Sequence, residues 1–108
     1  MDNAIDLKSK KEKLYEIKAE LTPCEDETSI ELVFKFKKPS VSSFDRYIKN
    51  VSKNSMKAMK TFIQDNIIEE QQAELEENLD KYPALALGIG EKLLTMLGLP
   101  KDTNFKML

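Results

Sequence analysis

An apolar run near the C-terminus constrains the fold more than any other part of this chain. The segment 81–98, KYPALALGIGEKLLTMLG, is the longest apolar stretch in a sequence of which 33% is charged. Its apolar side chains recur close to helical spacing, and a helix of this kind is normally buried by its neighbours. Pro83 suits a first helical turn, and Gly98 followed by Pro100 suits a helix end. We therefore expect a helix at about 83–97 around which the chain packs.

Two glycines inside this predicted helix need a physical reason. Glycine destabilises a helix interior by about 1 kcal/mol relative to alanine. The presence of Gly88 and Gly90 is explained if another helix approaches the backbone closely there. The approaching helix can belong to the same chain or to a partner, and the sequence leaves both alternatives open.

Two earlier segments alternate apolar and polar residues with a period of two. Segment 14–21 (LYEIKAEL) and segment 30–37 (IELVFKFK) both show this pattern, which is typical of half-buried strands. The residues between them, TPCEDETS, are turn formers. We expect an antiparallel hairpin over 14–38. Because an isolated hairpin is marginally stable, it must pack on helices or pair with another chain at its edge.

Helical spacing replaces this alternation after Pro39. Ser40 is a suitable N-cap for a helix at about 41–53, and Asn54 or Ser55 suits the start of a second at about 55–68. A third helix, with a thin apolar edge, is expected at about 70–81. The predicted class is α+β, as one domain over 1–108. It comprises a flexible arm or short helix (1–13), the hairpin (14–38), a helical part (39–98) and a tail (99–108) with apolar residues to pack or display.

The composition argues against catalysis. The chain has no histidine and a single cysteine, Cys24, so the usual base and nucleophile pairs, an internal disulfide and a cysteine metal cluster are all missing. The acidic stretch 69–80 lacks the turn-making glycine of a calcium loop, and Gly88-Ile89-Gly90 lacks the pattern of a phosphate loop. We predict a protein that is no enzyme, with no metal, no cofactor and no small-molecule substrate.

The ends and the hydropathy of the chain predict its compartment. No apolar run reaches the roughly 18 residues that a membrane span needs. The first residues, MDNAIDLKSKKEK, lack the apolar core of a signal peptide. We expect a cytoplasmic protein that does not bind membranes.

Charge is segregated along the helical part. The charged residues within 35–60 are all basic apart from Asp45, whereas the charged residues within 65–80 are all acidic. Three interpretations remain open: the two groups neutralise each other or lie in solvent, they join copies head to tail, or the basic half binds nucleic acid. We expect no nucleic-acid partner, because lysine dominates the basic half and few aromatics are interleaved. The residues predicted for self-association are Lys49, Lys53, Lys57, Lys60, Glu70, Glu74 and Glu77.

The order of motifs over about 30–98 resembles a known family. The motifs are 36–40 (FKKPS), 44–47 (FDRY), 56–59 (MKAM), 79–87 (LDKYPALAL) and 90–94 (GEKLL). This order resembles the small tail assembly chaperones of bacteriophages and prophages of Gram-positive bacteria. The resemblance implies a non-enzymatic protein of the host bacterial cytoplasm that coats the tape measure protein and hands it to tail tube subunits. It also implies that a longer, frameshifted form can exist.

Two other functions compete with this expectation. One is a small phage or bacterial regulator that binds nucleic acid through residues 35–60. The other is a structural tail or connector protein that remains in the virion.

If the client is a chain of varied apolar helical segments, an adaptable surface should receive it. Methionine lines such surfaces, but it also fills irregular gaps in cores. We predict that a client helix lies in a groove formed by two helical stripes. The residues of this predicted groove are Met56, Met59, Phe62, Leu85, Ile89, Leu93 and Leu97.

Overall fold

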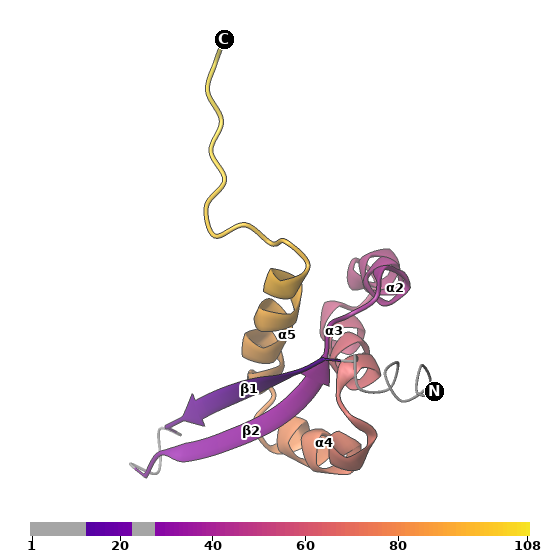
Figure 1. The fold of residues 1–108 in the computed structure, drawn as a ribbon, viewed down its shortest axis with the longest axis vertical. Coiled ribbons are helices and arrows are strands. Elements are labelled where there is room, and N and C mark those ends of the chain that lie inside the picture. Colours follow the sequence, from indigo (N-terminus) through magenta and orange to yellow (C-terminus); the bar gives the residue numbers. More distant parts are fainter. Residues whose placement is uncertain (1–12, 23–27) are drawn as a thin grey trace, which may run out of the picture.

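A computed structural model describes residues 13–22 and 28–108 of the protein. These residues form a hairpin of β1 (Leu14–Leu21) and β2 (Ile30–Lys37), followed by α2 (Val41–Val51), α3 (Ser55–Asn66), the 3-10 helix η1 (Glu69–Gln71), α4 (Gln72–Lys81) and α5 (Leu85–Met96) (Figure 1). The predicted α+β class, with its hairpin ahead of the helices, is confirmed. Most of the predicted arm (1–13) and Cys24 lie outside the described residues.

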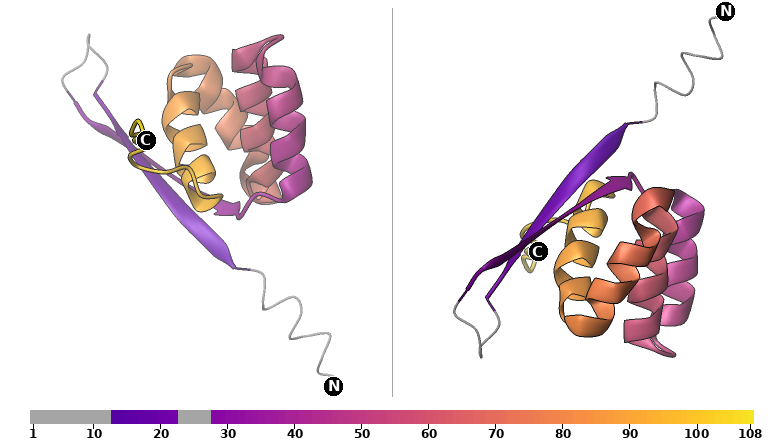
Figure 2. Two further views of the ribbon diagram at one scale, coloured as in Figure 1. Left: turned by 90° about the horizontal axis from the view of Figure 1, so that it is seen from above. Right: turned by 90° about the horizontal axis from the view of Figure 1, so that it is seen from below.

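The hairpin has the predicted strands and a regular antiparallel register. Leu14 pairs with Lys37 and Leu21 with Ile30. The alternating pattern works as expected, because Ile17, Phe34 and Phe36 are buried. Figure 2 shows the helices together on one side of the hairpin. The sheet is therefore half-buried, and its apolar face packs on the helical part.

The outer edge of β2 is covered by the segment between α3 and α4. Ile67 forms an isolated bridge with Phe36, and the Ile68 N–H donates to the Lys35 carbonyl at 3.0 Å. The Gln71 side chain then acts like a further strand residue: its Oε1 accepts from the Lys35 N–H at 2.7 Å and its Nε2 donates to the Val33 carbonyl at 3.3 Å. Covering an edge in this way protects it from pairing with other chains.

These edge contacts correct two predicted helix boundaries. The helix expected at 55–68 ends at Asn66, because Ile67 adopts an extended backbone to reach β2. The helix expected at 70–81 begins as η1, and its α-helical part starts only at Gln72.

The helix expected at 41–53 ends at Val51, since Asn54 must leave helical geometry to cap α3. The Asn54 side chain accepts a hydrogen bond from the Lys57 N–H at 3.0 Å. Ser40 caps α2 in the same way, because its side chain accepts from the Ser43 N–H at 3.1 Å.

The last helix is shorter than predicted at its start and ends as predicted. Pro83 lies in a turn ahead of the helix, and α5 begins at Leu85. At the other end Gly98 has φ 101°, and the N–H groups of Gly98 and Leu99 donate to the carbonyls of Thr95 and Leu94. This is a Schellman cap, which needs the left-handed backbone that glycine adopts without strain.

The core lies where α3, α4 and α5 meet the inner face of the hairpin. Gly90 shows how closely α5 approaches α3: a Cβ added there would lie 2.7 Å from Met59 Cε and still nearer to its sulfur. The close approach at Gly90 is therefore within one chain. Gly88 differs, because no described atom outside its two chain neighbours and its own helix backbone lies within 4 Å of the place where its Cβ would be. The core residues are Ile17, Phe34, Phe36, Met59, Phe62, Ile63, Ile67, Leu75, Leu79, Leu85, Ala86, Ile89 and Leu93.

Candidate partner-binding surface

Most of the predicted client groove lies inside the core. Five of its seven residues are buried, and the other two, Met56 and Leu97, are partly buried and packed against the same cluster. The two stripes face each other across the α3–α5 interface, so each covers the other and little of this set is open to a client helix. The polar substitutions at Met59 or Ile89 that would test such a groove would instead disrupt folding. The buried five are Met59, Phe62, Leu85, Ile89 and Leu93.

An open groove lies next to this core, between β1 and the first half of α5. It has a volume of about 620 Å³. Two members of the predicted set, Leu85 and Ile89, reach its wall, opposite Ala19 and Leu21 of β1. Gly88 also lines it and adds no side chain, which leaves room along the helix. We call this the β1–α5 groove, and its lining residues are 17–22, 81–85, Gly88, Ile89 and Lys92.

The β1 strand beside this groove has one edge without a backbone partner among the described residues. The sheet contains two strands in the order β1-β2, so β2 occupies one edge of β1 only. No backbone hydrogen bond from β1 to any other described element is found. In contrast to β2, whose edge Gln71 covers, β1 offers eight residues of edge to an added strand.

The C-terminal tail, residues 99–108, displays apolar side chains to solvent. Phe105 is 97% exposed and Met107 is 90% exposed, and Leu108 is fully exposed. Figure 1 shows the tail leaving the end of α5 and running away from the helices and the hairpin. Single exposed apolar residues are common, but three within four consecutive residues form an apolar segment that is available for a contact.

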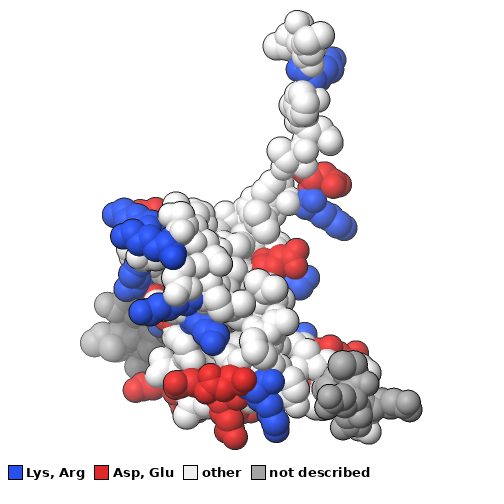
Figure 3. Space-filling model, turned by 180° about the vertical axis from the view of Figure 1, so that it is seen from behind, with Lys and Arg blue, Asp and Glu red and all other residues white. Residues whose placement is uncertain are grey.

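The charge segregation of the helical part is visible in Figure 3, where basic groups gather at the upper left and acidic groups gather at the bottom, with a basic group beside them. Six of the seven residues predicted for self-association are exposed; Lys60 is partly buried. Lys60 lines a shallow groove with Glu76 and Asp80, so part of the acidic α4 faces basic α3 within one molecule. Among the described residues, the ion pairs are Arg46–Asp65 and Lys18–Glu31, and neither includes a residue of the predicted set.

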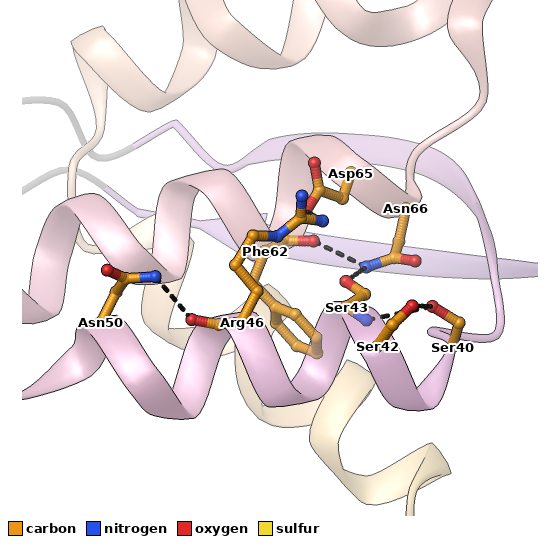
Figure 4. A network of polar contacts seen from close by, with 8 residues as sticks. All are labelled: Ser40, Ser42, Ser43, Arg46, Asn50, Phe62, Asp65 and Asn66. Carbon is orange, nitrogen blue, oxygen red and sulfur yellow. Dashed lines mark hydrogen bonds and ion pairs between the residues drawn. The ribbon is translucent and has the colours of Figure 1, made fainter.

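A polar network fixes α2 against α3 beside the basic residues (Figure 4). The buried Asn66 side chain donates to Ser43 Oγ at 3.1 Å and to the Phe62 carbonyl at 2.7 Å. Arg46 donates to Asp65 from the next turn of α2. A groove of about 400 Å³ next to this network is lined by Arg46, Lys53 and Lys57 among others. The Asp65 carboxylate also lines this groove and pairs with Arg46. The net positive charge that the groove offers to a phosphate is therefore smaller than the number of its basic residues suggests.

Two further findings concern the described residues only. Nowhere in 13–22 and 28–108 do three or more cysteine, aspartate or glutamate side chains gather as metal ligands would. In the same ranges, no helix has both the length and the apolar character for crossing a membrane.

Comparison with known proteins places the chain in a family. The solved structure of the uncharacterised protein rbstp2171 from Bacillus stearothermophilus is similar, with a TM-score of 0.74 and 30% sequence identity over 96% of this chain and 100% of that chain. No curated protein matches. A family model described as "Domain of unknown function (DUF6848)" matches residues 7–106. The chain belongs to this DUF6848 family.

Proposed function

We propose that this protein is a bacteriophage or prophage tail assembly chaperone that binds and solubilises the tape measure protein without catalysing a reaction. The β1–α5 groove is the observation that carries the proposal, because it places an open apolar surface beside a strand edge that has no partner in the part of the chain that the structure describes. Such a surface suits a client whose apolar segments must be kept from aggregating. The host cytoplasm is the corresponding compartment, and the tail tube protein is the second proposed partner.

The structure changes where the client is proposed to bind. Met59, Phe62 and Leu93 are buried in the core and are not accessible to a client. We therefore propose the neighbouring β1–α5 groove as the client site in their place. Leu85 and Ile89 belong to both, because one side of each reaches the groove wall. Gly88 also lines that wall, and because it has no side chain the groove stays open there.

Co-expression with the tape measure protein, followed by affinity capture, tests this proposal. The Gly88→Glu variant puts a charged side chain into the open groove without touching the core, and it also removes a helix-weakening glycine. We expect this variant to fold normally and to capture the client at least about tenfold less well, since a charge would be desolvated in an apolar contact. Gly88→Ala is the matched control, with the same backbone effect and no charge, and it should retain most of the client. Equal capture by both variants would remove the groove from the account.

The two other functions predict different results. A nucleic-acid-binding regulator would shift DNA or RNA in a strongly salt-dependent way, because phosphate contacts weaken steeply with salt. A structural tail protein would be present in purified particles, from which a chaperone should be absent. The head-to-tail charge contact between copies also stays a prediction, and added salt should weaken it.

A further inference from the structure

The C-terminal tail and the β1–α5 groove have complementary chemistry within one chain. The tail offers alternating residues, with Phe105 and Met107 separated by Lys106, all in an extended, exposed segment. The groove offers apolar side chains beside a strand edge that lacks a partner in the described structure. In an added strand, alternate side chains point to the same face, so Phe105 and Met107 would point together.

We propose that the tail of one copy adds as a third strand to β1 of a second copy, and that reciprocal exchange produces a symmetric dimer. Each copy would fill its partner's β1–α5 groove with Phe105 and Met107. A reciprocal exchange of this kind uses the same two surfaces on both copies and closes with two-fold symmetry.

Charge selects the register of this added strand. Glu20 lies directly opposite Glu31 on β2, a like-charge pair that is unfavourable in an antiparallel sheet. Lys18 forms an ion pair with Glu31 at 3.7 Å, and Glu20 has no ion pair in the described structure. If Lys106 lies opposite Glu20 on its free side, the tail supplies the missing positive charge.

This register also positions the apolar residues, whichever way the tail runs. With Lys106 opposite Glu20, the neighbours Phe105 and Met107 lie opposite Ala19 and Leu21, in one order or the other. Both Ala19 and Leu21 line the β1–α5 groove. One pairing therefore satisfies the charge of Glu20 and buries the two apolar side chains.

A second copy is a better occupant of the groove than the chain's own tail. The groove lies at the first half of α5, whereas the tail leaves from the opposite end of that helix and runs away from it (Figure 1). To reach its own groove, the tail would have to reverse direction and run back along α5. A tail of ten residues spans up to about 33 Å when extended, which is enough to cross to a neighbouring molecule.

The solution mass of the full chain, measured over a concentration series by analytical ultracentrifugation, tests the proposal. We expect a dimer, and we expect Phe105→Ser with Met107→Ser to raise its dissociation constant at least about 100-fold, since burying each side chain contributes about tenfold or more. Folding should not change, because both side chains are exposed in the single chain. Leu108→Ser is the matched control, because Leu108 would lie on the other face of the added strand, and it should change the constant by less than about threefold. The proposal would be overturned if the chain remained monomeric. It would also be overturned if Leu108→Ser raised the dissociation constant as much as the Phe105→Ser, Met107→Ser double variant does.

The register and the identity of the occupant need separate tests. Lys106→Glu and Glu20→Lys should each weaken the dimer, and combining them in one chain should restore it. In a Cys24→Ser background, the E20C/K106C variant should form a disulfide-linked dimer under oxidising conditions, because directly opposed strand residues are close enough to cross-link. An internal disulfide in a monomer would show that the tail folds back on its own chain, and would contradict the exchange.

A consequence for client binding rests on the proposed function: the tail and the client would compete for one groove. The double substitution at Phe105 and Met107 should then increase client capture. The dimer experiments use the protein alone, so their failure can be distinguished from a failure to bind the client.

Discussion

Replacing Phe36 by alanine is expected to lower the free energy of unfolding by about 3–5 kcal/mol. Phe36 has an exposed fraction of 0%, belongs to the core cluster and forms the bridge to Ile67 after α3. The loss would be a large part of the total stability of a chain of this size. Urea unfolding followed by circular dichroism measures it as a shift of the midpoint with an unchanged slope.

Phe105→Ala is the matched control for this prediction, because it is the same chemical change at a side chain that is 97% exposed. It should alter the stability by less than about 0.5 kcal/mol. Both variants should be measured at a protein concentration low enough to keep the chain monomeric, since association adds apparent stability. Similar losses in the two variants would mean that the tail packs on its own domain.

Replacing Gly90 by valine is expected to destabilise the protein by about 3 kcal/mol, because any side chain at this position enters the space of Met59, and inserting atoms into a packed interface forces neighbours to move. Gly88→Ala, two residues away on the same helix, should instead stabilise the protein by about 0.5–1 kcal/mol, because it meets no atom and favours the helix. Thermal and urea unfolding of the two variants should therefore shift in opposite directions.

A second substitution tests the cause of the Gly90 effect. The Met59→Ala change removes the atoms that the new side chain would meet. Substitutions at residues in contact do not have additive effects on the free energy of unfolding. The double variant that combines Gly90→Val with Met59→Ala should therefore lose less stability than the sum of the losses in the two single variants. Strict additivity would mean that the cost of Gly90→Val does not come from Met59.

Local patterns predicted much of this fold. The period-two alternation of Ile17 on one strand and Phe34 and Phe36 on the other predicted both strands, because a single buried face imposes that pattern. Ser40, Asn54 and Gly98 marked helix ends correctly, since capping depends on a few neighbouring backbone groups.

Boundaries set by distant contacts could not be predicted in the same way. Ile67 continues the apolar spacing of α3, yet it leaves the helix because Phe36, far away in the sequence, offers a strand partner. Gln71 looks like an ordinary helix residue, and only its position beside β2 lets its amide replace a neighbouring strand. Propensity cannot show such long-range hydrogen bonds.

The binding surface was the hardest part to predict for a physical reason. An apolar helical stripe has the same sequence pattern whether it faces the protein's own core or an external partner. Ile89 was predicted to line the client groove, and the structure buries it in the core. The sequence could not show that Met59 covers one side of α5 while the β1–α5 groove leaves another side open. The structure separates the two sides of α5 at its glycines. A Cβ at Gly90 would meet Met59 of α3, whereas a Cβ at Gly88 would point into open space.

Hydrogen–deuterium exchange on the complex with the tape measure protein tests the central claim, that the β1–α5 groove receives the client, most directly. The variant with both Phe105 and Met107 replaced by serine should be used, because its groove is not occupied by a second copy. The account predicts that the client slows exchange in β1 and in the first half of α5. Unchanged exchange in β1, with slowing confined to the basic residues of α2 and α3, would contradict it.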